Sequence, residues 1–567
     1  MHKKNAIQSP IQLAFDAGLI KENSKTCPIY ALKLAKCLIG HHIFFMDPEK
    51  VNYHYCDDLL TKPLHKGTRV LVTGSRGYIG HRLIPELLYR GYTVRCMLRD
   101  NLHPLLLDHP NLEIVYADVL KKKQLWVALK DVKAAYYLIH SMRETKEIFM
   151  ELDRKAAKNF FEVAEACNLE KIIYLGGLGE ATENISDHLR SRQEVGLTLA
   201  NAKATVIRLR AGIIIGTGSA SYELLKSLVI NNRWIPFLQK FNSRCQPIAI
   251  RDVIKYLVGV LETPGLSSKM YPIGGADVLS YKELIQEFAK EVKRKVRFID
   301  VSWVPFPVPW MCRLYAYWMN FFVSVPVNII SLLLNSLKTD VICSNQDIKT
   351  ILPFETVGYR TAIKWAQEKE KRSQVYSHWG GVAPETMSDL LPISEYEASE
   401  FLVDQHSIDI PTAPENIFKT VRRVGGDHGW VHANILWEIR GVIDRMLGGV
   451  GLNRGRRDPE NLRVGDAIDF WRVEKLDENK ELLLRAELLS PGLSWLQFIL
   501  EPIRTGHTRL ILKAHFIPFP LWGKIYWMSL SKFHDYIFKG MLKYFYLESM
   551  KLENSNKPLE GEKYETR

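Results

Sequence analysis

Three evenly spaced glycines, Gly74, Gly77 and Gly80, separate an apolar run (69–73) from a helical pattern. Glycines in such a turn let a phosphate come close to the backbone, and the N–H groups that open the following helix attract its negative charge. Strand, glycine turn and helix in this order are typical of a site for the diphosphate of a dinucleotide. We therefore expect the whole turn to bind a cofactor through Gly74, Ser75, Arg76, Gly77, Tyr78, Ile79 and Gly80.

Charged residues after the next two strands bear on which dinucleotide binds. Arg99 and Asp100 follow the second predicted strand, where a basic residue suits the 2′-phosphate of NADP and an acidic one suits the ribose of NAD. Arg76 adds positive charge, so the balance favours NADP, with NAD as the alternative. Asp118 and Val119 follow the third strand, where the Asp118 carboxylate either accepts from the adenine amino group or caps the next helix.

These residues need a parallel sheet that brings the strand ends to one edge. Apolar runs alternate with helical patterns, which predicts an α/β Rossmann-type doubly wound parallel sheet. The predicted strands are 69–73, 93–98, 112–116, 134–140, 171–175 and 204–208, and the predicted helices are 79–90, 122–129, 148–167 and 188–202. His140 and Ser141 stand at the end of the predicted strand 134–140, so in this arrangement we expect them near the place where a nicotinamide would lie.

Several of these segments together resemble a known family. The turn 74–80 and the segments 136–142, 172–179 and 188–196 are similar to those of atypical short-chain dehydrogenase/reductases, in the NmrA-like, complex-I-subunit-like branch. The similarity covers about residues 68–365. It implies NAD(P) binding and hydride transfer, which typical members of this superfamily perform with a serine and a Tyr-x-x-x-Lys set.

The chain departs from that catalytic set. Gly177 or Leu178 stands at the serine position, His188 at the tyrosine position and Arg192 at the lysine position. An arginine can hold a ribose or a phosphate but cannot exchange protons near neutral pH, whereas a histidine can. The resemblance therefore implies His188 or His140 as the acid and Arg192 as the cation that holds the cofactor.

After residue 216 the chain should leave the parallel sheet and form an apolar substrate lobe. Residues 314–337 carry no charge and are long enough to span a bilayer, although three asparagines and a proline interrupt them. We favour buried lobe helices over contact with a membrane surface, and either over a transmembrane span. Such a lobe favours a small hydrophobic substrate.

A different pattern begins at residue 399. The expected elements are a strand (401–410), a helix that starts at Pro414, further strands (466–473, 481–489, 495–501 and 509–516) and a long final helix (521–551). This is the helix-grip order, which predicts an α+β domain. Trp430, Trp437 and the segments 448–451, 454–458 and 470–472 resemble the START-like domain of a bacterial two-domain family of uncharacterised function. This resemblance implies an apolar cavity between the sheet and the last helix.

Two parts of this second domain have open interpretations. The loop 448–458 contains three arginines and four glycines, so it either clamps an anion or forms an ordinary surface loop. The last helix mixes aromatic residues with lysines, which suits core packing or a membrane-surface helix.

The composition sets limits on partners and location. The 567 residues carry a net charge of +13, which favours acidic partners, but no basic and aromatic run indicates nucleic-acid binding. The eight cysteines lack zinc-like spacing, so we expect no metal and a cytoplasmic location, with the inner face of a membrane as an alternative. We expect an N-terminal extension (1–66), an NAD(P)-binding domain (67–365), a connector (366–398), a START-like domain (399–552) and a charged tail (553–567).

Together these features favour an NAD(P)-binding oxidoreductase that transfers hydride to or from a hydrophobic carbonyl, quinone or enone, held with help from the START-like domain. Because the usual acid is missing, a non-catalytic NAD(P)-binding sensor or assembly protein is the alternative. A peripheral lipid-binding protein is a second alternative. The oligomeric state and the role of residues 1–66 stay open.

Overall fold

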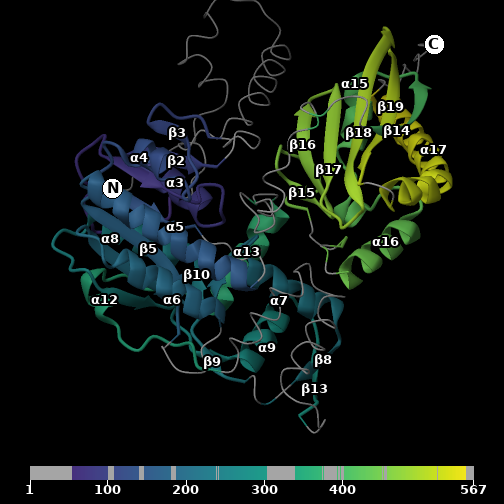
Figure 1. Ribbon diagram of the computed structural model, residues 1–567. Coiled ribbons are helices and arrows are strands. Elements are labelled where there is room, and N and C mark those ends of the chain that lie inside the picture. Colours follow the sequence, from purple (N-terminus) through teal and green to yellow (C-terminus); the bar gives the residue numbers. More distant parts are fainter. Residues whose placement is uncertain are drawn as a thin grey trace, which may run out of the picture.

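The computed structural model describes an α/β domain and a second domain built on an antiparallel sheet (Figure 1). The described residues are 54–99, 107–139, 146–179, 187–237, 242–302, 339–372, 401–447, 456–519 and 522–556, with a few single positions between these ranges. His140, Ser141 and the uncharged stretch 314–337 lie outside the described residues.

The first domain is organised around a seven-stranded parallel sheet in the order β11-β6-β5-β4-β1-β2-β3. Its strands are β1 (Arg69–Val72), β2 (Thr93–Leu98), β3 (Leu112–Tyr116), β4 (Ala134–Tyr137), β5 (Lys171–Gly177), β6 (Thr205–Ala211) and β11 (Met270–Ile273). The chain reverses its direction of winding between β1 and β4, and doubly wound sheets bind their ligands at this point. The predicted sheet is confirmed.

The edge strand β11 corrects one expectation. The chain does leave the sheet after residue 216, but it returns to pair β11 with β6 in parallel. The strand is only four residues long and contains Pro272, which a sheet tolerates at its edge. A short run with a proline gives little sequence signal for a strand.

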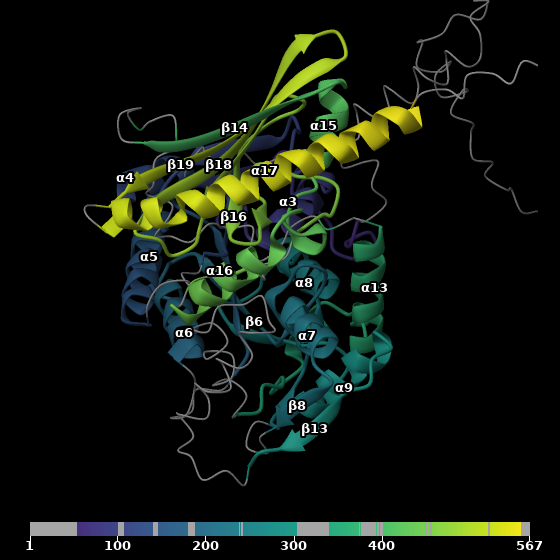
Figure 2. The same ribbon diagram turned by 90° about the vertical axis from the view of Figure 1, so that its right-hand side faces the viewer.

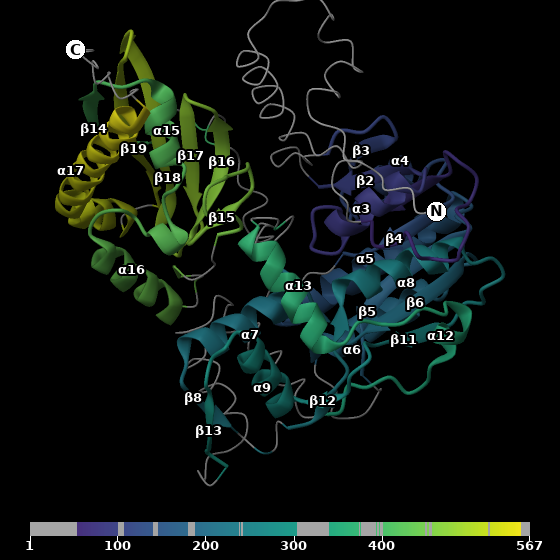
Figure 3. The same cartoon turned by 180° about the vertical axis from the view of Figure 1, so that it is seen from behind.

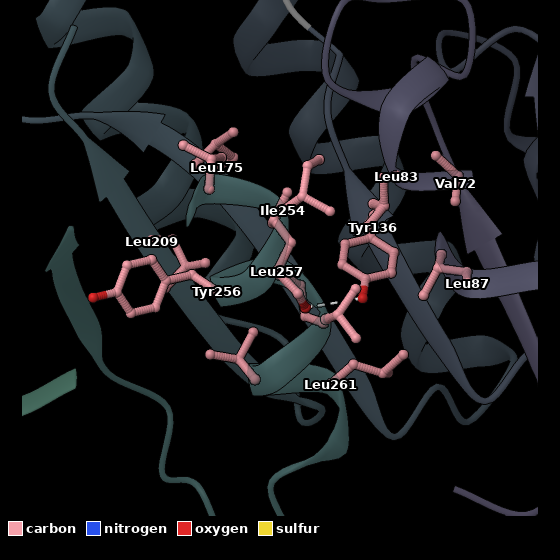
Figure 4. Packing of buried hydrophobic residues seen from close by; sticks show 14 of the residues in the cluster. Val72, Leu83, Leu87, Tyr136, Leu175, Leu209, Ile254, Tyr256, Leu257 and Leu261 are labelled. Atoms are coloured by element: carbon pink, nitrogen blue, oxygen red, sulfur yellow. Dashed lines mark hydrogen bonds between the residues drawn. The ribbon is translucent and has the colours of Figure 1, made fainter. Parts of the chain in front are cut away.

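Helices cover both faces of the sheet, and successive strand residues alternate between them. Val70 and Val72 pack under α3 (Gly80–Tyr89) and α8 (Ile250–Glu262). Leu71 faces α4 (Lys122–Leu129), α5 (Lys146–Ala166) and α6 (Asp187–Leu199). In the first of these cores the hydroxyl of Tyr136 donates to the carbonyl of Leu257 at 3.0 Å (Figure 4).

A smaller lobe follows the sheet. Its core joins α7 (Ala220–Asn231), α9 (Tyr281–Glu291) and α13 (Tyr359–Lys371), which lie side by side in Figure 3. Short elements complete it: β7 (Ile214–Ile215) with β10 (Ile248–Ala249), β8 (Trp234–Phe237) with β13 (Arg297–Asp300), β9 (Arg244–Cys245) with β12 (Leu279–Ser280), and α12 (Asp347–Ile351). In the described part of the chain, no helix combines the length and apolar character needed to cross a bilayer.

Part of the predicted N-terminal extension packs on the first domain. The side chain of Glu86 accepts a hydrogen bond from the backbone N–H of Tyr55 at 2.7 Å. Buried Glu262 accepts from Thr61 at 2.6 Å and pairs with Arg90 at 2.6 Å. Residues 54–64 are therefore anchored to α3 and α8 through carboxylates that the sequence pattern did not connect to them.

The second domain has a six-stranded antiparallel sheet in the order β14-β19-β18-β17-β16-β15. Its elements are β14 (Leu402–Ile410), α15 (Pro414–Val421), η5 (Gly426–His428), α16 (Asn434–Met446), β15 (Ala467–Ile468), β16 (Trp471–Asp477), β17 (Glu481–Ala486), β18 (Gly492–Arg504), β19 (His507–Pro518) and α17 (Trp522–Asn556). The long helix α17 crosses the sheet (Figure 2). Ile537, Phe538, Met541, Leu542 and Phe545 of this helix contribute to the core.

The order of elements after residue 399 agrees with the prediction, with two exceptions. The predicted strand 466–473 is divided between the short β15 and the start of β16, which continues to Asp477, because Asp469 turns the backbone with a φ of 54°. Helix α16 has no counterpart among the predicted elements. The START-like assignment and its cavity stay predictions.

Candidate functional site

Thr73 fixes the edge of the sheet at which the glycine loop begins. Its N–H and its hydroxyl both donate to the carbonyl of Tyr136 at 3.0 Å, and its hydroxyl accepts from the N–H of Leu138 at 3.0 Å. The carboxyl ends of β1 and β4 are thereby held together at the switch point of the sheet. Thr73 is not among the residues predicted from the sequence.

The loop has its tight shape because two of its glycines have no room for a side chain. Gly74 has a φ of 64°, and a Cβ there would lie 2.8 Å from the carbonyl oxygen of Leu138. A Cβ on Gly80 would lie 2.4 Å from the carbonyl oxygen of Gly74. These contacts fit the predicted roles of the first glycine in the turn and of the third in helix packing.

Gly77 lies at the centre of the loop, and its surroundings differ. The nearest atom to a Cβ placed on Gly77 is the carbonyl oxygen of Gly74 at 3.0 Å, and no other described atom lies within 4 Å. The loop therefore leaves space beside Gly77, as the close approach of a diphosphate requires. Helix α3 follows at once, and its N-cap residue, Ile79, has no side-chain acceptor for the first N–H groups.

The side chains of Ser75 and Tyr78 face the protein, so these residues can reach a ligand only through their backbone. The Ser75 hydroxyl is buried and donates to the carbonyl of Val72 at 2.7 Å. The Tyr78 ring points toward the lobe, where a Cβ on Gly216 would lie 2.5 Å from its oxygen. Burial raises the pKa of the Tyr78 hydroxyl to about 12, so it stays protonated.

Arg82 holds the loop from the first turn of α3. Its guanidinium lies 3.9 Å from the centre of the Tyr78 ring and donates to the carbonyls of Tyr78 at 3.2 Å and Thr217 at 2.8 Å. Arg82 therefore joins the loop to the lobe and keeps positive charge near α3. Burial, together with the charges of Arg82, Arg463 and Arg457, lowers the pKa of the neighbouring His81 to about 3, so that ring is neutral at pH 7.

The predicted residues of the second and third strand ends lie at the same edge. Arg99 is exposed directly after β2. The Asp118 carboxylate accepts from the N–H of Leu120 at 2.9 Å, which stabilises a turn ahead of α4, although the N-cap of that helix is Lys121. The carbonyl of Val119 accepts from Asn159 at 3.2 Å. Neither contact tests whether Asp118 or Val119 meets an adenine.

Arg192 is the predicted catalytic residue whose contacts are described. It lies on α6, and its Nη2 donates to the carbonyl of Leu175 at 2.6 Å. A side chain at Gly177 would have to displace Leu189, because a Cβ there would lie 2.6 Å from the Leu189 Cδ2 atom. His188 lies on α6, but its side chain is outside the described part of the structure, as is all of His140.

The loop after β5 is fixed by long polar side chains. Arg210 donates through Nε to the carbonyl of Gly177 at 3.1 Å and through Nη2 to that of Gly179. Gln193 also donates to the carbonyl of Gly179, at 3.1 Å. Arginines thus hold the backbone at the place where a typical reductase presents its serine. Arg210 was not predicted from the sequence, because its partners lie at the end of another strand.

Two arginines of the loop 448–458 in the second domain, Arg456 and Arg457, form hydrogen bonds within the protein. Arg456 donates to the carbonyls of Val424 at 2.7 Å and of Arg422 and Asp458 at 2.5 Å. Arg457 is paired with Asp466 at 3.0 Å. These contacts favour a structural role over anion clamping for both arginines. Arg454 lies outside the described residues.

An aromatic cluster forms one end of the second-domain core. The rings of Trp430 and Trp437 lie 5.1 Å apart, and those of Trp430 and Trp471 lie 5.9 Å apart. The indole N–H of Trp430 donates to the Asp469 carboxylate at 2.9 Å. Two tryptophans that carry the START-like resemblance, Trp430 and Trp437, therefore meet in this core.

Sequence families match both domains separately. Residues 74–209 match a family described as NAD(P)H-binding, and residues 399–541 match one described as a protein of unknown function (DUF2867). The first match contains the glycine loop, the strands β2 to β5 and most of β6, and it begins just after β1. The first domain is thus an NAD(P)-binding Rossmann domain, whereas the second match assigns no activity.

Curated relatives and solved structures show low identity. The chain is 26% identical over 117 residues to the sterol-4-alpha-carboxylate 3-dehydrogenase, decarboxylating, of Bos taurus, which is 20% of this chain and only 32% of that enzyme. It is 23% identical over 312 residues to the mitochondrial NADH dehydrogenase (ubiquinone) 1 alpha subcomplex subunit 9 of Arabidopsis thaliana, covering 52% of this chain and 76% of the relative. A structure of MoeE5 in complex with UDP-glucuronic acid and NAD aligns with a TM-score of 0.42 and 16% identity over 54% of this chain and 99% of MoeE5. In sequence the chain is therefore similar to a dehydrogenase over a fifth of its length and to a subunit of NADH dehydrogenase over about half of it.

Proposed function

We propose that the protein is an NADP(H)-dependent oxidoreductase that acts on a hydrophobic carbonyl, quinone or enone. The observation that carries the proposal is the glycine loop at the switch point, with space beside Gly77 and the N-terminus of α3 directly behind it. NADPH would supply the hydride when bound there. The residues of the chain would hold its diphosphate at backbone N–H groups and exclude water from the apolar lobe.

NADP is favoured over NAD by the charges at this edge. Arg99 is exposed where a 2′-phosphate would lie, after β2. Arg76 and Arg82 add positive charge on the loop and the helix that follows it. NAD has a neutral ribose hydroxyl at this place, which would instead call for a hydrogen-bond acceptor, and Asp100 is the candidate in the sequence.

An apolar substrate is supported by the lobe and by one relative. The stretch 314–337 contains no charged residue, and the bovine relative is named as a sterol-carboxylate dehydrogenase. Arg192, fixed by the carbonyl of Leu175, would hold the cofactor beside the end of β5. The proton would come from His188 or His140, since an arginine cannot exchange one near neutral pH.

A second candidate is a protein that binds NAD(P) without catalysis. It is favoured by the absence of a hydroxyl side chain at Gly177 and Leu178, where the typical reductase has its serine. The plant relative is named as a subunit of NADH dehydrogenase, which is an assembly of many chains. In this case the second domain would respond to cofactor binding in the first.

The test combines binding with turnover. Gly77→Ala places a methyl group in the space beside the loop, so NADPH affinity, measured by nucleotide fluorescence, should fall at least about tenfold. Gly358→Ala is the matched control, because its Cβ would lie 3.2 Å from the Asp277 carboxylate, far along the chain in the lobe. Equal affinities of wild type and the Gly77 variant would contradict the proposed site.

Turnover separates the two candidate functions. An enzyme should oxidise bound NADPH with at least one quinone, enone or lipid-like carbonyl, and His188→Gln or His140→Gln should abolish this reaction while binding is retained. Binding that is intact in the wild type without turnover on any such acceptor would favour the non-catalytic protein.

A further inference from the structure

Helix α16 of the second domain presents an apolar stripe on its outer side. Ile435, Ile439 and Ile443 recur every four residues, Met446 and Leu447 continue the row, and all five side chains are exposed. Residues at this spacing share one face of a helix. Ile435, with 70% of its surface exposed, marks one end of a stripe that covers nothing in the described part of the chain.

The stripe is directed outward because the other face of α16 is anchored. The Asp444 carboxylate is fully buried and accepts from the N–H of Gly451 at 2.8 Å and from that of Leu489 at 2.7 Å. Gly441 is also buried, against Leu452. Leu436 and Trp437 of the same helix pack against the core, so α16 is apolar on its inner side and on its outer side, whereas a surface helix usually presents polar residues to solvent.

The first half of α17 has a similar outer face. Trp522 and Met528 are 70% and 74% exposed, and Ile525, Phe533 and Tyr536 are exposed as well. In the second half of the helix five apolar side chains turn into the core (Ile537, Phe538, Met541, Leu542 and Phe545), while Tyr544 and Leu547 are exposed. The exposed apolar residues are therefore most frequent at the end of α17 that lies toward α16.

Contacts connect these two apolar faces. Arg440 of α16 donates to the carbonyl of Leu489 at 2.7 Å, and the N–H of Phe519, just before α17, donates to the carbonyl of Pro491 at 2.9 Å. The ring of His432, just before α16, lies 4.9 Å from that of Tyr536. Figure 2 shows both helices on the side of the second domain turned to the viewer. We call their exposed apolar side chains the α16/α17 surface.

Positive charge lies beside this surface. Between residues 522 and 547 the sequence has four lysines (Lys524, Lys532, Lys539 and Lys543) against one acidic residue, Asp535. Lys524 and Lys543 are exposed, and Lys539 pairs with Asp535 at 2.7 Å. An apolar helix face with aromatic residues and adjoining lysines is the composition that anionic bilayers bind.

We propose that the α16/α17 surface docks onto an anionic lipid bilayer. The exposed isoleucine, methionine and aromatic side chains would enter the interface, and the lysines would contact lipid phosphates. A second copy of the chain is a poorer occupant, because a two-fold contact would set the same lysines against one another. The proposal does not depend on the NADP(H) function. It would place the second domain on a bilayer, where apolar molecules are dissolved.

Vesicle flotation of the full chain tests the proposal. The protein should float with vesicles of phosphatidylcholine and phosphatidylglycerol, float less with phosphatidylcholine alone, and lose binding in about 0.5 M salt. Ile439→Glu and Met528→Glu should each reduce binding to the anionic vesicles about tenfold, because each puts a charge where an apolar side chain enters the lipid.

Val127→Glu is the matched control. Val127 lies on α4 of the first domain and is 56% exposed, compared with 51% for Ile439, so this variant should bind vesicles as the wild type does. Equal melting temperatures establish that all three variants are folded. The proposal is overturned if the wild type does not float with anionic vesicles, or if Val127→Glu lowers binding as much as the other two. It is also overturned if Ile439→Glu and Met528→Glu leave flotation unchanged but dissociate an oligomer in light scattering, because a second copy would then cover the surface.

Discussion

Glu86 connects the start of the first domain to the helix that follows the glycine loop. Its buried carboxyl accepts from the N–H groups of Tyr55 at 2.7 Å and Cys56 at 3.3 Å. Burial raises the pKa of Glu86 from 4.5 to about 7, although these hydrogen bonds act in the opposite direction. Its charge therefore changes close to neutral pH.

The pKa of Glu86 predicts a pH dependence of stability. Between about pH 4.5 and pH 7 the folded protein holds a proton that the unfolded chain has lost, so the free energy of unfolding should fall as the pH rises through this window. The fall should reach about 3 kcal/mol and should be absent from Glu86→Gln. Thermal melts of both proteins at about pH 5 and about pH 8 measure it. A difference between the two proteins that is the same at both pH values would show that Glu86 does not titrate in this range.

Arg99 predicts the nucleotide preference. Arg99→Ser should weaken NADPH binding about tenfold to hundredfold, because a charge-assisted hydrogen bond to the 2′-phosphate is lost, and should leave NADH binding unchanged. Lys203→Ser is the control, since Lys203 is exposed just before β6, at the amino end of a strand on the other side of β1 from β2. Competition titrations with both nucleotides decide the matter. If NADPH and NADH weaken together, Arg99 does not read the 2′-phosphate.

At the scale of elements, Lys171 shows how a strand supports a helix. Its ammonium group donates to the carbonyls of Val260, Leu261 and Thr263, which end α8, at 3.0, 2.9 and 3.1 Å. The first residue of β5 therefore caps the helix that covers the sheet. Burial lowers the pKa of Lys171, but its three acceptors suit the charged form.

Lys171→Met should lower the free energy of unfolding by about 2 kcal/mol, because three carbonyls at the end of α8 lose their donor. Lys133→Met is the control, since the Lys133 side chain is half exposed and its pairing with Glu170 at 3.5 Å is weak. Thermal unfolding followed by far-UV circular dichroism measures both effects. Equal melting temperatures of the two variants would mean that water replaces the lysine at no cost.

Elements with a strong local pattern could be predicted from the sequence, and those held by distant contacts could not. The predicted bounds of β2, β3 and α4 and the predicted start of α15 agree with the structure, because apolar spacing and end signals lie within each segment. The break at Asp469 has a distant cause. Its carboxylate accepts from the N–H of Gly426 at 3.2 Å and from the indole of Trp430, about forty residues earlier in the chain. Helix α16 was missed because its isoleucines face solvent.

The same distinction holds in the candidate site. The glycine loop was predicted because its spacing is local. Thr73 and Arg82 were missed because their partners, the carbonyls of Tyr136 and Thr217, lie 63 and 135 residues away. The sequence feature that could have indicated Arg82 is a charged residue within an otherwise apolar helical pattern. His188 and His140 stay predictions, since their side chains lie outside the described residues.

At the scale of the whole molecule, the segment between the domains contacts the second one. The buried guanidinium of Arg457 donates to the carbonyl of Val375 at 3.3 Å, and the N–H of Ile393 donates to Glu474 at 2.8 Å. The rings of Tyr396 and Trp495 lie 5.7 Å apart. These contacts suggest that the second domain folds with the predicted connector rather than without it.

A fragment of residues 373–556 should therefore be more stable than one of residues 401–556, by about 2 kcal/mol, because the shorter fragment leaves the partners of three contacts unpaired. Urea unfolding of the two fragments measures the difference. Tyr396→Ala in the longer fragment is the control, since it removes one ring and keeps both hydrogen bonds. Identical midpoints for the two fragments would show that the connector adds nothing to the second domain.

The tryptophans also divide between the two halves of the chain. Those of the first domain that are described, Trp126, Trp234 and Trp365, are exposed, whereas Trp430, Trp471 and Trp495 of the second are buried. Among the tryptophans that the structure describes, those expected to emit at short wavelength are therefore Trp430, Trp471 and Trp495, whereas Trp522, near the end of the chain, is exposed. One cuvette can then follow two events separately: loss of nucleotide fluorescence reports the first half, and the red shift of indole emission reports the second.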